Sequence, residues 1–146
     1  IALAEARKAY AQGEIPIGAI IVCEDKLIAK AHNQVMQKNN PTMHAELIAI
    51  QRAVEYFGLK RIIDSVMYVN LEPCPMCAGA LVLARIKKLY FGAKSDKNGS
   101  CGTVFNIASS GFLNHQVEII SGLLEKESQD LIQKFFREIR FKRKNK

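Results

Sequence analysis

The segment Leu71–Ala80 reads LEPCPMCAGA, and the segment Pro41–Glu46 reads PTMHAE. In the first, Pro75 is expected to open a helix, because proline is favoured at the first helical position, where its missing N–H would have had no partner. Cys74 is then the N-cap of this helix. Cys77 follows one turn later on the same face, so both sulfur atoms can point at one metal ion.

The second segment predicts the start of another helix, which would point at the same metal ion. Thr42 is expected to cap this helix, and its first turn carries His44 and Glu46. Structural zinc sites fill all four positions with protein groups, whereas catalytic sites use three and leave the fourth to water. His44, Cys74 and Cys77 give three suitable ligands without an obvious fourth. Glu46 is not needed as a ligand and is free to act as a general base and acid.

Each half of this pattern is weak on its own. An isolated CxxC motif can be a redox-active pair, half of a structural zinc site or a buried pair of thiols. The combination with an upstream HxE, each half opening a predicted helix, favours a catalytic zinc site over these alternatives. HxE together with PCxxC is also a signature of zinc-dependent nucleobase deaminases. The pattern therefore indicates a zinc-dependent hydrolase.

The rest of the chain alternates between predicted helices and strands. Apolar runs over residues 17–23 and 27–33 predict a hairpin, because an acidic turn separates them. A strand, a helix and a strand between residues 65 and 92 predict a parallel pair with a right-handed crossover. The complete set of further elements comprises helices over residues 1–12, 43–57, 75–85 and 123–140 and strands over residues 65–71, 87–92 and 117–120.

Length and composition predict a single domain over residues 1–146. Of these residues 49% are hydrophobic, which is enough for a full core. Four cysteines without regular spacing form no disulfide framework and favour a reducing, cytoplasmic location. No apolar run approaches the roughly 18 residues that span a bilayer, so no membrane association is expected. The chain begins at Ile1 inside a predicted helix, and we expect a further N-terminal segment to precede it.

Two cysteines lie outside the motif. Cys23 belongs to an apolar strand and is expected in the core. Residues 93–102 are rich in Lys, Ser, Asn, Asp and Gly, which predicts an exposed loop with Cys101 as a spare thiol.

Positive charge is concentrated at the C-terminus. Residues 137–146 contain six basic residues and one acidic residue, which accounts for five of the seven net positive charges of the chain. A basic stripe at a helix end is typical of proteins that contact a phosphate backbone. Charge alone is equally consistent with a solvated terminus, residues 141–146 being a basic tail.

Together the motifs resemble those of the bacterial tRNA-specific adenosine deaminases over nearly the whole chain. The similarity extends to IPIGAII at Ile15–Ile21, AHN at Ala31–Asn33, RIKKLYFGAK at Arg85–Lys94 and DLIQKFFREIR at Asp130–Arg140. The resemblance implies a three-layer α/β/α, cytidine-deaminase-like fold with a five-stranded mixed sheet, one zinc ion per subunit and a homodimer. It also implies hydrolysis of the wobble adenosine to inosine in the anticodon stem-loop of a tRNA, usually an arginine tRNA.

The resemblance assigns roles residue by residue. His44, Cys74 and Cys77 match the zinc ligands of the family, and Glu46 matches its proton shuttle. Asn33 matches the residue that holds the flipped base, although composition alone favours an ordinary turn asparagine there. The other positions that match the family's substrate-binding residues are Ile17 and Ala45 beside the base and Phe135, Phe136, Arg137 and Arg140 beside the anticodon loop.

The chain departs from the family at three positions and leaves two rival interpretations open. Asn40, Met43 and Ser95 stand where the family commonly has aspartate, alanine and an acidic residue. One rival keeps the chemistry but acts on free guanine or cytosine, for which the basic C-terminal helix has no use. The other is a structural-zinc RNA-binding module, which would need Cys23 or Cys101 as a fourth ligand.

Overall fold

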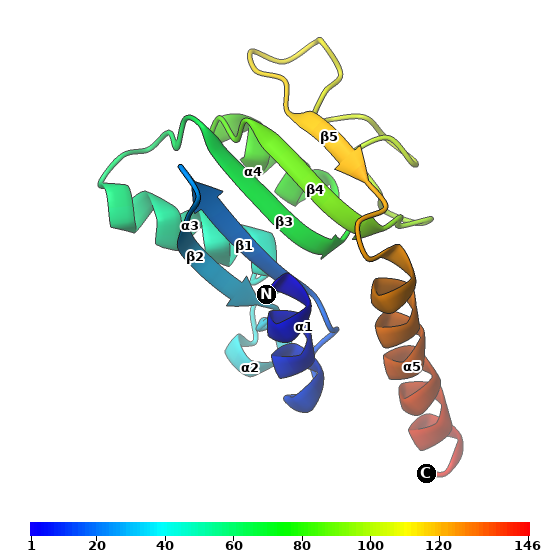
Figure 1. Cartoon of the computed structure of the whole chain (residues 1–146). Coiled ribbons are helices and arrows are strands. Elements are labelled where there is room, and N and C mark those ends of the chain that lie inside the picture. The colour runs from blue at the N-terminus through cyan, green and yellow to red at the C-terminus, as the bar shows by residue number, and fades with distance from the viewer.

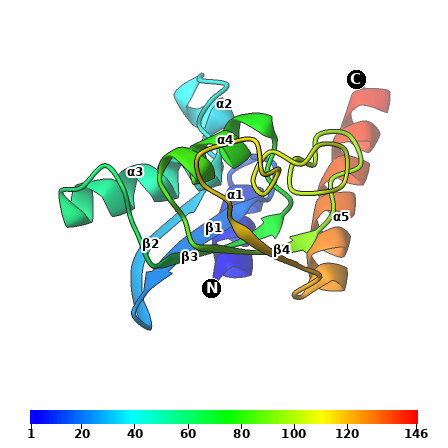
Figure 2. The ribbon, with the colours of Figure 1, turned by 90° about the horizontal axis from the view of Figure 1, so that it is seen from above.

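The computed structural model describes residues 1–146 as one five-stranded sheet between two layers of helices (Figures 1 and 2). The strand order is β2-β1-β3-β4-β5. The strands are β1 (Gly18–Cys23), β2 (Lys26–His32), β3 (Ser65–Leu71), β4 (Lys88–Ala93) and β5 (Glu118–Ser121). β1 is antiparallel to β2 and β3, whereas β3, β4 and β5 are parallel. The predicted hairpin, parallel crossover and three-layer mixed-sheet fold are confirmed.

Side-chain alternation along the strands assigns a helical layer to each face. Ala19, Val69 and Phe91 lie in register across β1, β3 and β4 and belong to the main hydrophobic core. Helices α3 (Ala45–Phe57) and α4 (Pro75–Leu83) contribute to the same core and cover that face. Helices α1 (Ala2–Ala11) and α5 (Glu125–Lys144) pack on the opposite face (Figure 2).

The observed element ends differ from the predicted ones for local reasons. α3 begins at Ala45 because His44 has an extended backbone. α5 begins after Leu124, whose positive φ of 53° stops the helix from starting earlier, and it continues to Lys144. Most of the basic tail is therefore helical. The short helix α2 (Val35–Lys38) was not predicted, because four residues carry no usable periodicity.

Two glycines make room for α1 and α5 on their face of the sheet. Gly18, Asn70 and Gly92 are neighbours across β1, β3 and β4, on the side away from the main core. A Cβ atom at Gly18 would lie 2.2 Å from the carbonyl oxygen of Ala2, and one at Gly92 would lie 2.5 Å from the hydroxyl of Ser128. The missing side chains therefore let α1 and α5 approach the sheet closely.

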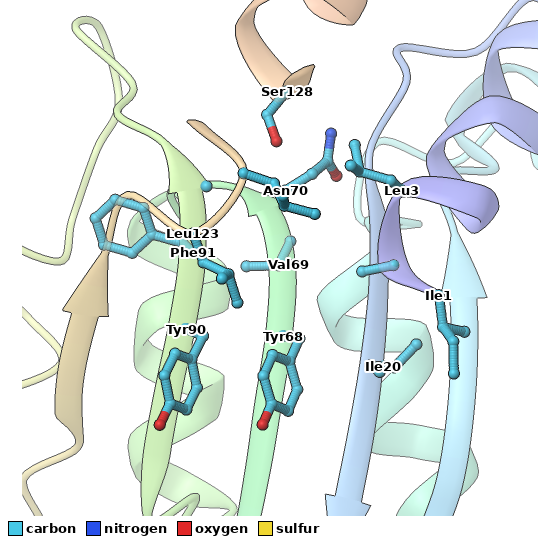
Figure 3. Close-up of a pocket in the computed structure, with 13 residues that line it drawn as sticks. Ile1, Leu3, Ile20, Tyr68, Val69, Asn70, Tyr90, Phe91, Leu123 and Ser128 are labelled. Atoms are coloured by element: carbon cyan, nitrogen blue, oxygen red, sulfur yellow. The ribbon is translucent and has the colours of Figure 1, made fainter. Parts of the chain in front are cut away.

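Asn70 connects this face to the start of β1. Its Oδ1 accepts a hydrogen bond from the Gly18 N–H at 2.8 Å, and its Nδ2 donates to the Pro16 carbonyl at 2.8 Å. Asn70 also lies beside a mainly apolar pocket between α1 and α5, where Tyr68 and Tyr90 stack with ring centroids 4.8 Å apart (Figure 3). The amide thus fixes the segment that carries Ile17.

No helix in the structure combines the length and the apolar character that crossing a bilayer requires.

We expect Asn70→Ala to lower the free energy of unfolding by about 2–4 kcal/mol, because it leaves a buried N–H and a buried carbonyl unpaired. Urea denaturation measures this change. Asn98→Ala is the matched control, since Asn98 is exposed and its side chain makes no hydrogen bond in the structure. Equal free energies for the two variants would contradict the role given to Asn70.

Candidate metal centre and active site

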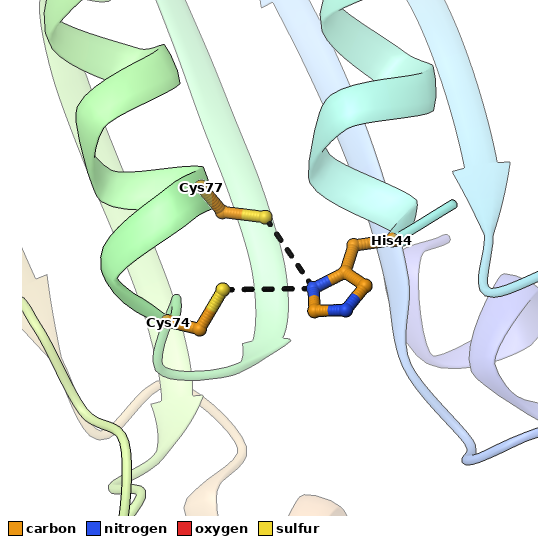
Figure 4. Close-up of side chains that lie close together, drawn as sticks. All are labelled: His44, Cys74 and Cys77. Carbon is orange, nitrogen blue, oxygen red and sulfur yellow. Dashed lines mark hydrogen bonds between the residues drawn. The ribbon is translucent and has the colours of Figure 1, made fainter. Parts of the chain in front are cut away.

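His44, Cys74 and Cys77 meet where β3 ends and two helices begin (Figure 4). The Nδ1 atom of His44 lies 3.6 Å from the sulfur of Cys74 and 3.6 Å from the sulfur of Cys77. All three potential ligand atoms lie within 4.8 Å of one another, and no other residue belongs to this group. The structure therefore brings together the three residues that the sequence motif singled out.

Helix capping explains how the chain positions these ligands. Cys74 is the N-cap of α4 and Pro75 its first residue, as predicted. The prediction that Thr42 caps the next helix is wrong, because His44 occupies the N-cap of α3. Thr42 instead donates from its N–H and its hydroxyl to Oδ1 of Asn40, which forms a turn before the helix.

The donor set and its spacing fit zinc. Zinc bonds of about 2.3 Å to sulfur and about 2.0–2.1 Å to nitrogen, at a tetrahedral angle, place a sulfur and a nitrogen about 3.6 Å apart. Both Nδ1-to-sulfur distances in the structure equal this spacing. Thiolate and imidazole ligands in a tetrahedral arrangement also select zinc over magnesium or calcium.

The surroundings of Cys74 favour its thiolate form, which is the form that binds metals. Hydrogen bonds from Cys77 and then His44 outweigh partial burial and lower the pKa of Cys74 to about 4. The pKa of Cys77 is raised, first by its hydrogen bond to Cys74 and then by burial. The cluster thus offers a metal ion one preformed thiolate.

Glu46 projects from the first turn of α3 and is almost fully buried. Its Oε2 atom has no hydrogen-bond partner in the structure, although it is inaccessible to solvent. Burial raises the pKa of this carboxyl to about 7. An unpartnered buried carboxylate oxygen is costly for a folded protein and is typical of a group kept for chemistry.

Asn33 lies just past β2, beneath the start of α3. Its Oδ1 accepts a hydrogen bond from the N–H of Ala45 at 2.9 Å, and its own N–H donates to the Ile17 carbonyl. His44, the N-cap residue, makes no capping hydrogen bond with its own side chain. Asn33 therefore caps α3 in its place. The amide NH₂ of Asn33 makes no protein hydrogen bond in the structure and remains a donor beside the cluster.

Glu72 is a structural residue of the site that the motif analysis missed. It is buried without a cationic partner, and four donors surround its carboxylate. These donors are the N–H groups of Ser95, Cys101 and Thr103 and the hydroxyl of Thr103. Glu72 therefore ties the loop over residues 95–103 to the strand end that carries Cys74.

The two remaining cysteines do not complete the cluster. Cys101 was expected to be exposed, but it is buried because its N–H turns inward to Glu72, and burial raises its thiol pKa to about 12. Cys23 was expected in the core but is only partly buried, at the end of β1. Neither belongs to the metal-ligand group, so the structure gives no fourth cysteine ligand for a structural zinc site.

The residues expected to contact RNA do not share one environment. Phe135 is buried and packs its ring against Tyr10, with centroids 5.8 Å apart, so it anchors α5 and is unavailable to a partner. Phe136, Arg137 and Arg140 are exposed on the same helix. α5 extends beyond the sheet on the side where the parallel strands end (Figure 1).

This fold, with a His–Cys–Cys cluster beside a buried glutamate, defines the class of the chain as a deaminase. The chain matches the family model of the MafB19-like deaminases over residues 1–140. It is 45% identical to the tRNA-specific adenosine deaminase of Bacillus subtilis (strain 168) over 143 residues, which are 98% of this chain and 89% of that protein.

Two solved structures are also similar. One, from a study of A-to-I editing by tRNA:A34 deaminases at the wobble position, has a TM-score of 0.84 and 40% identity, covering 89% of this chain and 94% of that one. The guanine deaminase of Bacillus subtilis has a TM-score of 0.63 and 36% identity, covering 70% of this chain and 66% of that one. The chain therefore belongs to the MafB19-like deaminase family and, within it, to the tRNA-specific adenosine deaminases.

We expect Glu72→Ala to make the amides of Cys101 and Thr103 exchange with solvent about tenfold faster or more. Alanine has no oxygen to accept the bonds that these N–H groups donate to Oε2, and an unpaired buried donor costs about 1–3 kcal/mol. Hydrogen exchange read by mass spectrometry measures the change. Glu55→Ala, on the exposed side of α3, is the control. Unchanged protection in the 95–103 loop would refute the link.

Proposed function

We propose that this chain hydrolyses adenosine to inosine at the wobble position of a tRNA anticodon, with an arginine tRNA as the expected substrate. The observation that carries the proposal is the unpartnered, buried carboxylate oxygen of Glu46 beside the His44–Cys74–Cys77 cluster. The names of the curated relative and of the solved tRNA deaminase support the choice of substrate.

His44, Cys74 and Cys77 would hold one zinc ion per subunit. Zinc bound to three protein ligands supplies a Lewis acid that lowers the pKa of water from about 15.7 towards about 7. The protein positions these ligands by two helix starts, whose positive ends also favour negative charge at this point.

Glu46 carries the proton chemistry. Its free oxygen accepts a proton from the attacking water while the water oxygen forms a bond to C6 of adenine. Glu46 then delivers this proton to ring N1 and assists proton transfer to the exocyclic amine. The C6–N6 bond breaks, ammonia leaves with the electron pair of that bond, and a carbonyl remains at C6.

The base itself is held by the groups around the N-terminus of α3. The NH₂ of Asn33 can donate to an acceptor on the purine, because its carbonyl oxygen is already occupied by Ala45. Ile17, 9% exposed, can offer a small apolar surface beside it, whereas Ala45 is fully buried and would act through its backbone, which Asn33 holds. The adenine must leave its stack to reach this place, and this costs little in an anticodon loop because its bases are unpaired.

We further propose that the enzyme is a homodimer whose contact includes α4. This helix has no charged residue between Pro75 and Ala84. Its outer side exposes Leu83 at 76%, with Met76 and Gly79 partly exposed on the preceding turns. An uninterrupted apolar stripe on a helix is typical of a protein–protein interface.

The cysteines indicate the cellular compartment of the enzyme. Four free cysteines, two of them in the metal cluster, suit a reducing cytoplasm. We propose residues 1–146 as one zinc-dependent deaminase domain. The rival in which the same centre acts on free guanine or cytosine gives no use to the cationic C-terminal helix.

Replacing Glu46 by glutamine should abolish inosine formation without removing zinc. We expect the deamination rate on a transcribed tRNA to fall at least about 100-fold, because the amide cannot shuttle protons, while the ratio of zinc to protein stays at one. Inosine mapping and metal analysis measure the two quantities. Glu55→Gln is the control on the same helix. Activity of the unaltered protein on free bases but on no tRNA would instead establish the rival function.

Leu83→Lys is expected to convert the dimer to a monomer at low micromolar concentration, since a charge buried at the end of an apolar stripe has no partner. Light scattering after size exclusion gives the mass. Met36→Lys serves as the control, because Met36 is equally exposed, at 74%, but lies on α2. A variant that remains dimeric would place the interface elsewhere.

A further inference from the structure

Phe141 is an exposed aromatic residue on an ordered helix. α5 continues to Lys144, and the ring of Phe141 is 69% exposed. By contrast, Phe135 is 6% exposed and anchors the helix on Tyr10. Phe141 therefore plays no part in packing α5 onto the body of the protein, and its exposure needs a separate explanation.

Two of the four helix neighbours of Phe141 on α5 are cationic. At about 100° per residue, Arg137 lies about 160° round the helix from the anchoring Phe135, and Phe141 lies about 120° round. Arg137 and Lys144 are spaced four residues before and three residues after Phe141, so they are its neighbours along the surface. Arg140 lies about 100° round the helix from Phe141. Glu138, three residues before Phe141, is also its neighbour and is the only acidic residue between Arg137 and Lys146.

We propose that Phe141 is a stacking platform for an unpaired RNA base, with Arg137 and Lys144 contacting the phosphates on either side. The inference deepens the proposed tRNA function and rests on it. Single-stranded RNA offers both features that this surface complements, namely negative phosphates and the flat faces of unstacked bases. A paired stem offers only the phosphates. A second copy of this chain would bring another cationic helix against the first.

The position of α5 suits this role. The helix extends from the edge of the sheet at which β3 and β4 end, and the His–Cys–Cys cluster lies at the same edge (Figure 1). Phe141 is 16 residues from the start of α5, which is about 24 Å along the helix at 1.5 Å per residue. The base that meets Phe141 would therefore lie several nucleotides from the wobble base and not next to it.

The test compares RNA affinity for matched variants by fluorescence anisotropy. The probes are a labelled anticodon stem-loop and a blunt-ended, fully paired RNA duplex of the same stem sequence. We expect Phe141→Leu, which keeps an apolar helix former but removes the aromatic face, to weaken binding of the stem-loop about fivefold or more and to leave binding of the duplex unaffected. Phe141→Trp should restore the affinity. Phe112→Leu, at a site 95% exposed outside α5, is the control.

Salt dependence separates stacking from charge. Arg137→Gln should reduce the slope of log affinity against log salt by about 0.7, whereas Phe141→Leu should leave this slope unchanged. Equal losses on the stem-loop and the paired duplex, or no loss with Phe141→Leu, would overturn the proposal. So would a change of oligomeric state in Phe141→Leu, because the ring would then face a second copy. If the proposed tRNA function is wrong, the unaltered protein will form no inosine in a tRNA. This result is distinguishable from a failure of the Phe141 proposal, which is measured by binding.

Discussion

The contact between His44 and the two cysteine sulfurs joins parts of the chain that are 30 and 33 positions apart. It depends on the parallel pairing of β3 with β4, which places the end of β3 and the start of α4 at one edge of the sheet. It also depends on Asn33, which holds the first N–H of α3 and thereby sets where His44 lies. Both supports are made of backbone hydrogen bonds and a buried amide, so the ligand geometry is a property of the fold and not of loose side chains.

Much of this centre could be predicted because its signals are local. The Cys-Pro-x-Cys spacing specifies a helix start and two ligands on one face, and the structure has both. The roles of Glu72 and Cys101 were not predictable in this way. The loop over residues 95–103 looks polar and exposed in the sequence, yet its amides turn inward to a carboxylate more than 20 residues away. Neither periodicity nor spacing records such a contact.

The cap of α3 and the contacts of α5 show the same limit. Threonine is a residue type that favours the N-cap. The hydroxyl of Thr42, however, donates to Oδ1 of Asn40 in the turn before the helix. An aspartate oxygen could accept the same two bonds, which explains why asparagine is tolerated there. At Ser95 the contact with Glu72 uses the backbone N–H, and the side-chain oxygen accepts a bond from the Asn98 N–H that an acidic side chain could also accept. On α5, the spacing of Leu131, Ile132, Phe135 and Ile139 already puts Phe135 on the apolar side, but only the structure shows that its partner there is Tyr10.

The four hydrogen bonds to Glu72 limit how far the protein can change shape when it binds its substrate. Because all four bonds end on one side chain, the 95–103 segment cannot swing away piecemeal, and freeing it would leave a bare negative charge in a dry interior. This segment therefore behaves as a rigid part of the protein, attached directly to the strand end that precedes Cys74. A tRNA bound as proposed would have to adapt its own backbone to it.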